Sequence, residues 1–228
     1  MAQNKKKQQA SSGISARVIV IAAAVVVVLA AGIAVFASGG GDSSSGDTTV
    51  APVDGGAAPG EYQKVTVEGE ALQALGKDAA DPSLGKVGPN LSGFNFSGLP
   101  VSIKPATDGA PTMLVFLAHC CPHCNAEMPR LVNWYEDGLV PDDLRVVGIA
   151  TASRKDQANW PPSEWMPSFD WPFEVFTDSE VNDAGVAYGV DGYPFMVILD
   201  KDGKVVARHS GEMDEAEIPN FVNKALGR

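Results

Sequence analysis

Beyond residue 60, hydrophobic residues fall into two nearly continuous runs and several periodic segments. The runs cover residues 112–118 and 144–150, and neither alternates with polar positions. A strand with one solvated face would alternate, so both runs predict strands that are buried on both faces. Between them, apolar residues recur at helical spacing at Met128, Leu131, Val132 and Tyr135. This spacing predicts a helix that begins at Pro122, is kinked at Pro129 and ends near Gly138.

Shorter patterns on either side complete the predicted elements. Further strands are expected at 62–69, on both sides of a turn at 97–100, at 174–178, and as a hairpin across a turn at 200–203. Two more helices are expected, one capped by Ser179 and running to about Tyr188, the other from about Asp214 to Leu226. Strands that interleave with helices indicate an α/β fold with helices on both faces of a central sheet.

The segment 18–37 carries no charged side chain and predicts a transmembrane helix. A helix of that length spans the roughly 30 Å hydrocarbon core of a bilayer. Basic residues precede the segment and acidic residues follow it. The positive-inside bias therefore predicts a cytoplasmic N-terminus at 1–17 and export of everything that follows the helix. A cleaved signal peptide that ends before Ser38 is the alternative.

The chain after this segment divides into a linker and one domain. Gly, Ser, Pro, Ala and Asp dominate residues 38–60, and such a composition buries too little apolar surface to fold. We expect a flexible tether there and a single domain over 61–228. The formal net charge is −11, and the cations at the N-terminus make the remainder more acidic still. A surface so acidic repels nucleic acid, so nucleic-acid binding is excluded.

All three cysteines lie within residues 114–129, and Cys121 and Cys124 form a C-x-x-C pair. Cys121 falls where the predicted strand meets the helix, so its sulfur faces free backbone N–H groups and the positive end of the helix dipole. Both favour the reactive thiolate, and a protonated His123 adds positive charge nearby. Cys124 lies one helical turn further on and is less exposed. We therefore expect Cys121 to attack a substrate and Cys124 to resolve the mixed disulfide.

Two other interpretations of the cysteine cluster stay open. A C-x-x-C disulfide closes a small loop and gains little unfolded-state entropy, so a purely structural bridge is disfavoured. A metal site would draw on His119, Cys120, Cys121, His123 and Cys124. Consecutive ligands rarely converge on one ion, and the sequence has no second ligand pair with zinc spacing, so redox chemistry is preferred. Cys120, at the end of the strand, is expected to be a free, non-essential thiol, because a bridge to its neighbour would close a strained ring.

These motifs together resemble the thioredoxin-like superfamily. A buried strand leads into Cys-Pro-His-Cys and Asn-Ala-Glu-Met-Pro, and much later Gly-Tyr-Pro precedes an apolar strand and hairpin. Within the superfamily the chain is most similar to the membrane-anchored, exported TlpA/ResA-type branch, over about residues 90–227. The resemblance implies a thioredoxin-like fold with a central mixed sheet flanked by helices, joined to the N-terminal transmembrane helix.

The resemblance also implies roles for individual residues. It makes Cys121 the attacking and Cys124 the resolving cysteine, and it places Glu127 near them, where a glutamate moves protons. Pro194 matches a proline that follows a cis peptide bond and faces the disulfide, which leaves the Tyr193 backbone free to pair with a substrate strand. The alternatives are a solvated helix glutamate and an ordinary loop proline.

Some positions depart from the family pattern. Cys120 stands where relatives carry tryptophan. Val115 stands where thioredoxin carries a buried aspartate. Valine cannot accept a proton, so Glu127 becomes the stronger candidate for the proton acceptor. The dipeptide Pro122-His123 resembles that of the DsbA-type oxidants, whereas the framework resembles the TlpA/ResA-type reductants. The sequence therefore leaves the direction of electron flow open.

The sequence thus predicts a single-pass membrane protein whose extracytoplasmic domain is a thiol–disulfide oxidoreductase. Its expected partners are thiols and disulfides of exported proteins and a membrane redox partner. No organic cofactor is expected, because the chain has no Gly-rich phosphate loop. A copper-handling protein and a peroxiredoxin are the alternatives, and the second conflicts with Ala118, where a peroxidatic motif carries Thr or Ser.

Two further groups of residues are given structural roles. His209 is expected on the surface of the hairpin rather than as a ligand. Trp160, Trp165 and Trp171 lie in a proline-rich insertion between two strands, which we expect to pack its own aromatic side chains.

Overall fold

The computed structural model describes residues 55–76 and 80–228. No helix in these two ranges is long and apolar enough to cross a membrane. The predicted N-terminus 1–17, the predicted transmembrane helix 18–37 and most of the predicted linker 38–60 lie outside the described residues.

Eight strands of the described chain form one mixed sheet, which confirms the predicted α/β architecture. They are β1 (Thr66–Glu68), β2 (Asn90–Phe94), β3 (Pro100–Ile103), β4 (Thr112–Leu117), β5 (Arg145–Ala150), β6 (Glu174–Thr177), β7 (Phe195–Leu199) and β8 (Val205–Ser210). The order along the sheet is β1-β2-β6-β5-β4-β7-β8, and β3 pairs with β2. Strands β4, β5 and β6 are parallel, while β7 runs antiparallel to both β4 and β8.

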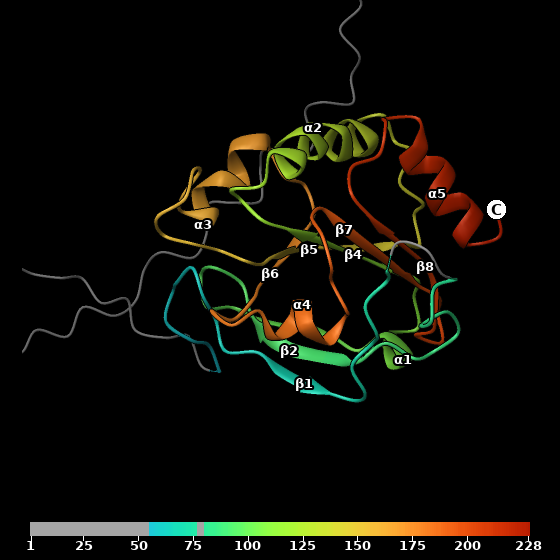
Figure 1. Cartoon of the computed structure of the whole chain (residues 1–228), viewed down its shortest axis with the longest axis horizontal. Coiled ribbons are helices and arrows are strands. Elements are labelled where there is room, and N and C mark those ends of the chain that lie inside the picture. The colour runs from blue at the N-terminus through green and yellow to red at the C-terminus, as the bar shows by residue number, and fades with distance from the viewer. Residues whose placement is uncertain (1–54, 77–79) are drawn as a thin grey trace, which may run out of the picture. The chain divides into compact units, whose positions relative to one another are not determined.

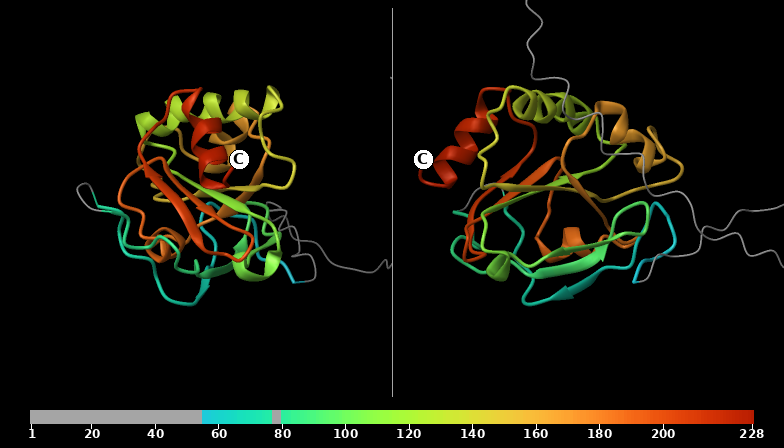
Figure 2. Two further views of the ribbon diagram at one scale, coloured as in Figure 1. Left: turned by 90° about the vertical axis from the view of Figure 1, so that its right-hand side faces the viewer. Right: turned by 180° about the vertical axis from the view of Figure 1, so that it is seen from behind.

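Helices cover both faces of this sheet. They are α1 (Pro105–Asp108), α2 (Pro122–Glu136), α3 (Pro162–Trp165), α4 (Asp183–Ala187) and α5 (Glu217–Ala225), with a 3-10 turn η1 at Pro167–Phe169. Helices α2, α3 and α5 lie on one side of the central strands β4, β5 and β7, and α4 lies on the opposite side, toward the edge strands β1 and β2 (Figure 1). The views from the side and from behind show the same layers (Figure 2).

Strand β4 lies between two hydrophobic cores, and each of its residues is buried. Alternate side chains of a strand point to opposite faces. One core contains Met113, Val115, Leu117, Cys124, Met128, Leu131 and Trp134. The other contains Leu114, Phe116, Phe176, Tyr188 and Phe195. The continuous apolar run in the sequence is therefore the signature of a central strand that has a core on each face.

Three of the predicted elements need correction. On α2, Tyr135 is 50% exposed and Trp134 is buried instead. Both rings contact Phe173, which comes before β6, so the last turn of α2 leaves Tyr135 at the rim. The helix predicted to begin at Ser179 is shorter: the Ser179 hydroxyl accepts a hydrogen bond from the Asp183 N–H at 3.0 Å, and α4 begins only there. The last helix is also shorter at both ends than predicted.

The insertion between β5 and β6 packs its own aromatic side chains, as predicted. Trp165 is buried and meets Phe169 edge-on at 5.9 Å between ring centroids. Trp171 meets Phe173 edge-on at 5.1 Å. The insertion also reaches the segment that follows β4, because Trp160 contacts the ring of His119 at 5.8 Å. It therefore lies against the start of α2.

Candidate active site

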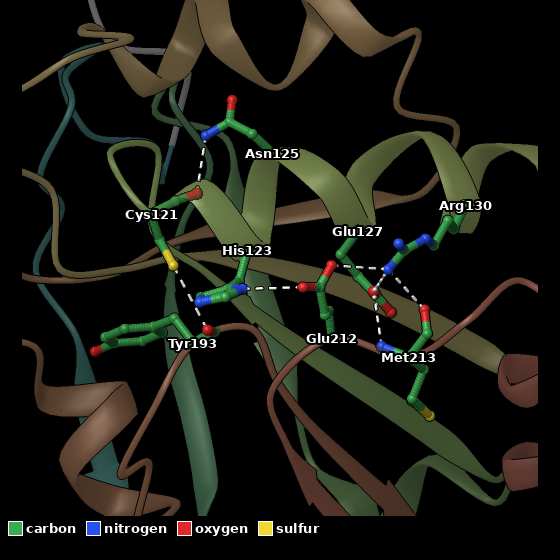
Figure 3. Close-up of polar contacts among 8 residues, drawn as sticks. All are labelled: Cys121, His123, Asn125, Glu127, Arg130, Tyr193, Glu212 and Met213. Atoms are coloured by element: carbon green, nitrogen blue, oxygen red, sulfur yellow. Dashed lines mark hydrogen bonds and ion pairs between the residues drawn. The ribbon is translucent and has the colours of Figure 1, made fainter.

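Cys121 is half-buried and is the residue immediately before α2. The sequence predicted this position, at the junction of a buried strand and a helix. Strand β4 ends at Leu117, and a turn closed by the Cys121 N–H and the Ala118 carbonyl at 3.0 Å leads into the helix. The Cys121 sulfur therefore lies at the N-terminal end of α2, where free N–H groups and the helix dipole favour an anion. Its thiol also donates to the Tyr193 carbonyl at 3.5 Å (Figure 3).

Cys124 has the opposite environment. It is fully buried in the core between α2 and the sheet. Burial raises the pKa of its thiol strongly, against the hydrogen bond that its sulfur accepts from the Ala118 N–H at 3.4 Å. The two motif cysteines, which are both thiols in this structure, thus differ in access: Cys121 is half-buried at the end of the helix, and Cys124 is fully buried.

The buried Pro194 brings a distant part of the chain to the cysteines. The Tyr193–Pro194 peptide bond is cis, as the family resemblance implied. Pro194 precedes β7, the antiparallel neighbour of β4, and this pairing carries Tyr193 to the start of α2. The Tyr193 carbonyl thus lies 3.5 Å from the Cys121 sulfur, and the role of Pro194 beside the disulfide stays a prediction.

Glu127 is fully buried, so its interpretation as a solvated helix glutamate is wrong. Its Oε2 accepts hydrogen bonds from the Met213 N–H at 3.0 Å and from Arg130 Nη1 at 3.3 Å. Its Oε1 is buried and has no hydrogen-bond partner. Burial raises its pKa to about 6, against the opposing effect of those two hydrogen bonds. Glu127 lies one turn beyond Cys124, so the buried carboxyl group and the buried thiol belong to neighbouring turns of α2.

The exposed His123 contacts an acidic residue that the sequence did not single out. Its Nδ1 lies 3.0 Å from Glu212 Oε1, and Glu212 also accepts a hydrogen bond from Arg130 at 2.9 Å (Figure 3). Glu212 follows β8 and is 89 residues from His123 in the chain. No local pattern in the sequence signals this contact, because it arises only when the end of β8 packs beside α2.

Asn125 is a second residue that the sequence did not reveal. Its amide group donates to the carbonyls of Cys121 at 2.8 Å and His119 at 3.2 Å. Its carbonyl oxygen accepts from Trp165 Nε1 at 3.0 Å and from Asn159 at 3.2 Å. Asn125 therefore joins the first turn of α2 to the insertion.

The copper-handling alternative would need a histidine beside Cys120 and Cys124. His119 is buried, and its two ring nitrogens contact the Ala158 carbonyl at 2.6 Å and the Arg154 N–H at 3.0 Å. Neither nitrogen is free to bind a metal in this arrangement. Across 55–76 and 80–228, no three His, Cys, Asp or Glu side chains are grouped so that they could hold an ion.

Two smaller expectations need correction. His209 is half-buried rather than on the surface, because its ring packs against Phe221 of α5 at 6.0 Å. Cys120 is a half-buried free thiol, but it lies in the turn after β4 and not at the end of the strand.

The fold and the site together define a thioredoxin-like protein with a two-cysteine motif beside a cis-proline. More particularly, the chain belongs to the AhpC/TSA family, whose model matches residues 84–208. A crystal structure of a thiol:disulfide interchange protein of the thioredoxin family from Chlorobium tepidum has a similar fold. The TM-score is 0.50 at 22% identity, and the match covers 66% of this chain and 100% of that one.

Curated relatives confirm the predicted similarity to TlpA/ResA-type proteins. The thiol-disulfide oxidoreductase ResA of Bacillus cereus is 26% identical over 152 residues, which cover 67% of this chain and 84% of ResA. The thiol:disulfide interchange protein DsbE of Haemophilus influenzae is 27% identical over 107 residues, which cover 47% of this chain. The match spans 54%, about half, of the length of that DsbE.

Proposed function

We propose that this protein is a thiol–disulfide oxidoreductase that exchanges disulfides with protein substrates through Cys121 and Cys124. The observation that carries the proposal is the unequal environment of the pair: Cys121 at the start of α2, 3.5 Å from the Tyr193 carbonyl, and Cys124 buried behind it. The names of the DsbE and ResA relatives support the same activity.

The reaction follows from these environments. In the reducing direction the Cys121 thiolate attacks one sulfur of a substrate disulfide, forms a mixed disulfide and releases the first substrate thiolate. The Cys124 thiol loses its proton and attacks Cys121 Sγ, which forms the Cys121–Cys124 disulfide and releases the second substrate thiolate. The substrate gains two electrons and the cysteine pair loses two. The oxidising direction is the reverse, and the reduction potential of the pair relative to its partners selects between them.

Glu127 has a role in the second step of this reaction. The Cys124 thiol is held in its neutral form by burial, so its attack needs a proton acceptor inside the core. Glu127 lies one turn further along α2 and has a pKa of about 6 and an unpartnered Oε1. We assign it the transfer of the Cys124 proton.

We further propose that residues 18–37 anchor the protein in the cell membrane with the domain outside the cytoplasm. The apolar segment and the basic residues before it support this orientation. Substrates would then be thiols and disulfides of exported proteins, with a membrane protein as redox partner. Retention in the membrane after an alkaline wash, with protease access to the domain from outside, would support the anchor. Release of a chain shortened at Ser38 would show a cleaved signal peptide instead.

The activity is tested with single cysteine variants of the full chain. Cys121→Ser should reduce exchange with a disulfide-bonded peptide to the uncatalysed rate, since a serine hydroxyl is not ionised at neutral pH. Cys124→Ser should still attack but should accumulate mixed disulfides, which mass spectrometry detects. Cys120→Ser is the matched control and should exchange at close to the wild-type rate. The proposal fails if Cys121→Ser retains exchange or if Cys120→Ser loses it.

A further inference from the structure

A network of charged side chains connects the motif to Glu127 (Figure 3). His123, Glu127 and Arg130 lie at positions i, i+4 and i+7 of α2 and share one face of the helix. Glu212 reaches that face with both oxygens: Oε1 lies 3.0 Å from His123 Nδ1, and Oε2 accepts from Arg130 Nη1 at 2.9 Å. The same Arg130 nitrogen donates to Glu127 at 3.3 Å.

Backbone hydrogen bonds fix Glu212 from both sides. The N–H of Gly211, the preceding residue, donates to the Pro194 carbonyl at 2.9 Å. The N–H of Met213, the following residue, donates to Glu127 Oε2 at 3.0 Å. Glu212 therefore lies in a three-residue bridge between the cis-proline and α2, and its side chain extends from that bridge toward His123.

Electrostatic coupling acts along this network. The hydrogen bond from His123, and then that from Arg130, lowers the pKa of Glu212. Burial raises the pKa of Glu127, and like-charge repulsion from Glu212 adds to it. The charged or titratable groups in contact with Glu212 are His123 and Arg130, and Glu127 contacts Arg130 and the Met213 N–H. An isolated surface ion pair contributes little, but here one member of the network is buried, where water and salt screen its charge least.

We propose that Glu212 is a positioning residue of the redox site, which couples His123 of the motif to the buried Glu127 through Arg130. The proposal rests on the proposed function and assigns that site a residue outside the motif. The negative charge of Glu212 acts at both ends of the network. It holds the His123 ring beside the bridge, and it competes with Glu127 for the Arg130 guanidinium. Through this network, the charge on the exposed His123 influences whether the buried Glu127 carboxyl group holds its proton.

The test is the titration of the Glu127 carboxyl group by carbon NMR in the full chain in detergent, for wild type and Glu212→Gln. Glu212→Gln removes the repulsion between the Glu212 and Glu127 carboxylates, and the Arg130 guanidinium then pairs with Glu127 alone. The Glu127 pKa should therefore shift downward from about 6. Glu215→Gln is the matched control. It is exposed and three residues away, and it contacts Asn133 instead of the network. Glu215→Gln should leave the Glu127 titration unchanged.

A reciprocal variant keeps the test independent of one substitution. His123→Ala removes the largest influence that lowers the Glu212 pKa, so the Glu212 titration should move upward toward its usual range. An unchanged Glu127 titration in Glu212→Gln, or an equal shift in Glu215→Gln, would overturn the proposal. Neither titration needs disulfide exchange, so both stay informative if the cysteine variants contradict the proposed activity. If that activity holds, the pH dependence of exchange should shift in the same direction as the Glu127 titration.

Discussion

At the scale of single residues, the burial of Glu127 makes the stability of the protein depend on pH. Burial raises its pKa from 4.5 to about 6, so the folded state binds this proton more tightly than the unfolded state does. The resulting stabilisation is fully present below pH 4.5 and is lost as the pH rises through about 6. A shift of this size corresponds to about 1 to 2 kcal/mol.

Glu127→Gln should remove this dependence, because a glutamine has no proton to release. Between pH 4.5 and 7, the unfolding free energy of wild type should fall by about 1 to 2 kcal/mol relative to the variant. Urea unfolding at several pH values measures the difference. Glu136→Gln is the control, since Glu136 is exposed on the same helix and should leave the profile of wild type unchanged. If the unfolding free energies of wild type and Glu127→Gln changed equally with pH, the raised pKa of the buried Glu127 carboxyl group would be contradicted.

At the scale of elements, Asn125 determines how the insertion lies against α2. Its side chain satisfies the indole N–H of the buried Trp165 and the carbonyls of His119 and Cys121. A buried polar group that loses its partner costs about 1 to 3 kcal/mol. The first turn of α2, which carries the cysteine pair, is therefore stabilised from outside the helix.

Asn125→Ala should destabilise the fold by about 1 to 3 kcal/mol, because Trp165 Nε1 loses its acceptor. The Trp165 indole N–H should also exchange with solvent faster in this variant than in wild type. Asn133→Ala is the matched control on the same helix: its exposed side chain hydrogen-bonds to the exposed Glu215, and the variant should change stability by less than about 0.5 kcal/mol. Equal losses in the two variants would show that the insertion does not depend on Asn125.

At the scale of the whole molecule, Arg208 joins the N-terminal part of the domain to its C-terminal hairpin. Its side chain is fully buried on β8 and forms a bidentate ion pair with Asp81, 127 residues away in sequence. It also donates to the carbonyls of Gln73 at 2.8 Å and Tyr188 at 3.2 Å, and it lies over the Phe195 ring at 5.9 Å. Loss of one partner of a buried pair is costly, because it leaves the other charge uncompensated.

Asp81→Asn should therefore destabilise the protein by about 3 to 5 kcal/mol, and Asp81→Asn with Arg208→Met should lose less than the sum of the single variants. Burial, the largest single influence, raises the pKa of Asp81, but the hydrogen bonds from Arg208 and the Ser83 N–H and the nearby positive charges together outweigh it and hold the pKa below its usual range. The contribution of the pair is thus present above about pH 3.9 and is lost as the pH falls further. Acid unfolding of the variants measures it, and additive losses would show that the pair is not coupled.

Local sequence patterns determined the framework and the core of the site. The largely apolar runs at 112–118 and 144–150 predicted β4 and β5 because a strand covered on both faces does not alternate between apolar and polar positions. The C-x-x-C spacing at a strand-to-helix junction identifies Cys121 and Cys124 because helix geometry alone places them one turn apart. Pro194 could be named only through the Gly-Tyr-Pro resemblance, and its cis peptide bond agrees with it.

Tertiary structure alone decided the surroundings of the cysteine pair. Glutamate on a helix is usually exposed, and the sequence does not show that Glu127 is buried with only its Oε2 hydrogen-bonded, by the Met213 N–H and Arg130. Glu212 and Asn125 contribute through partners that lie 34 to 89 residues away in sequence. Hydrophobic periodicity reports which face of an element is covered, but not which side chain covers it. The contacts that set charge at this site form only when the end of β8 and the insertion pack against α2.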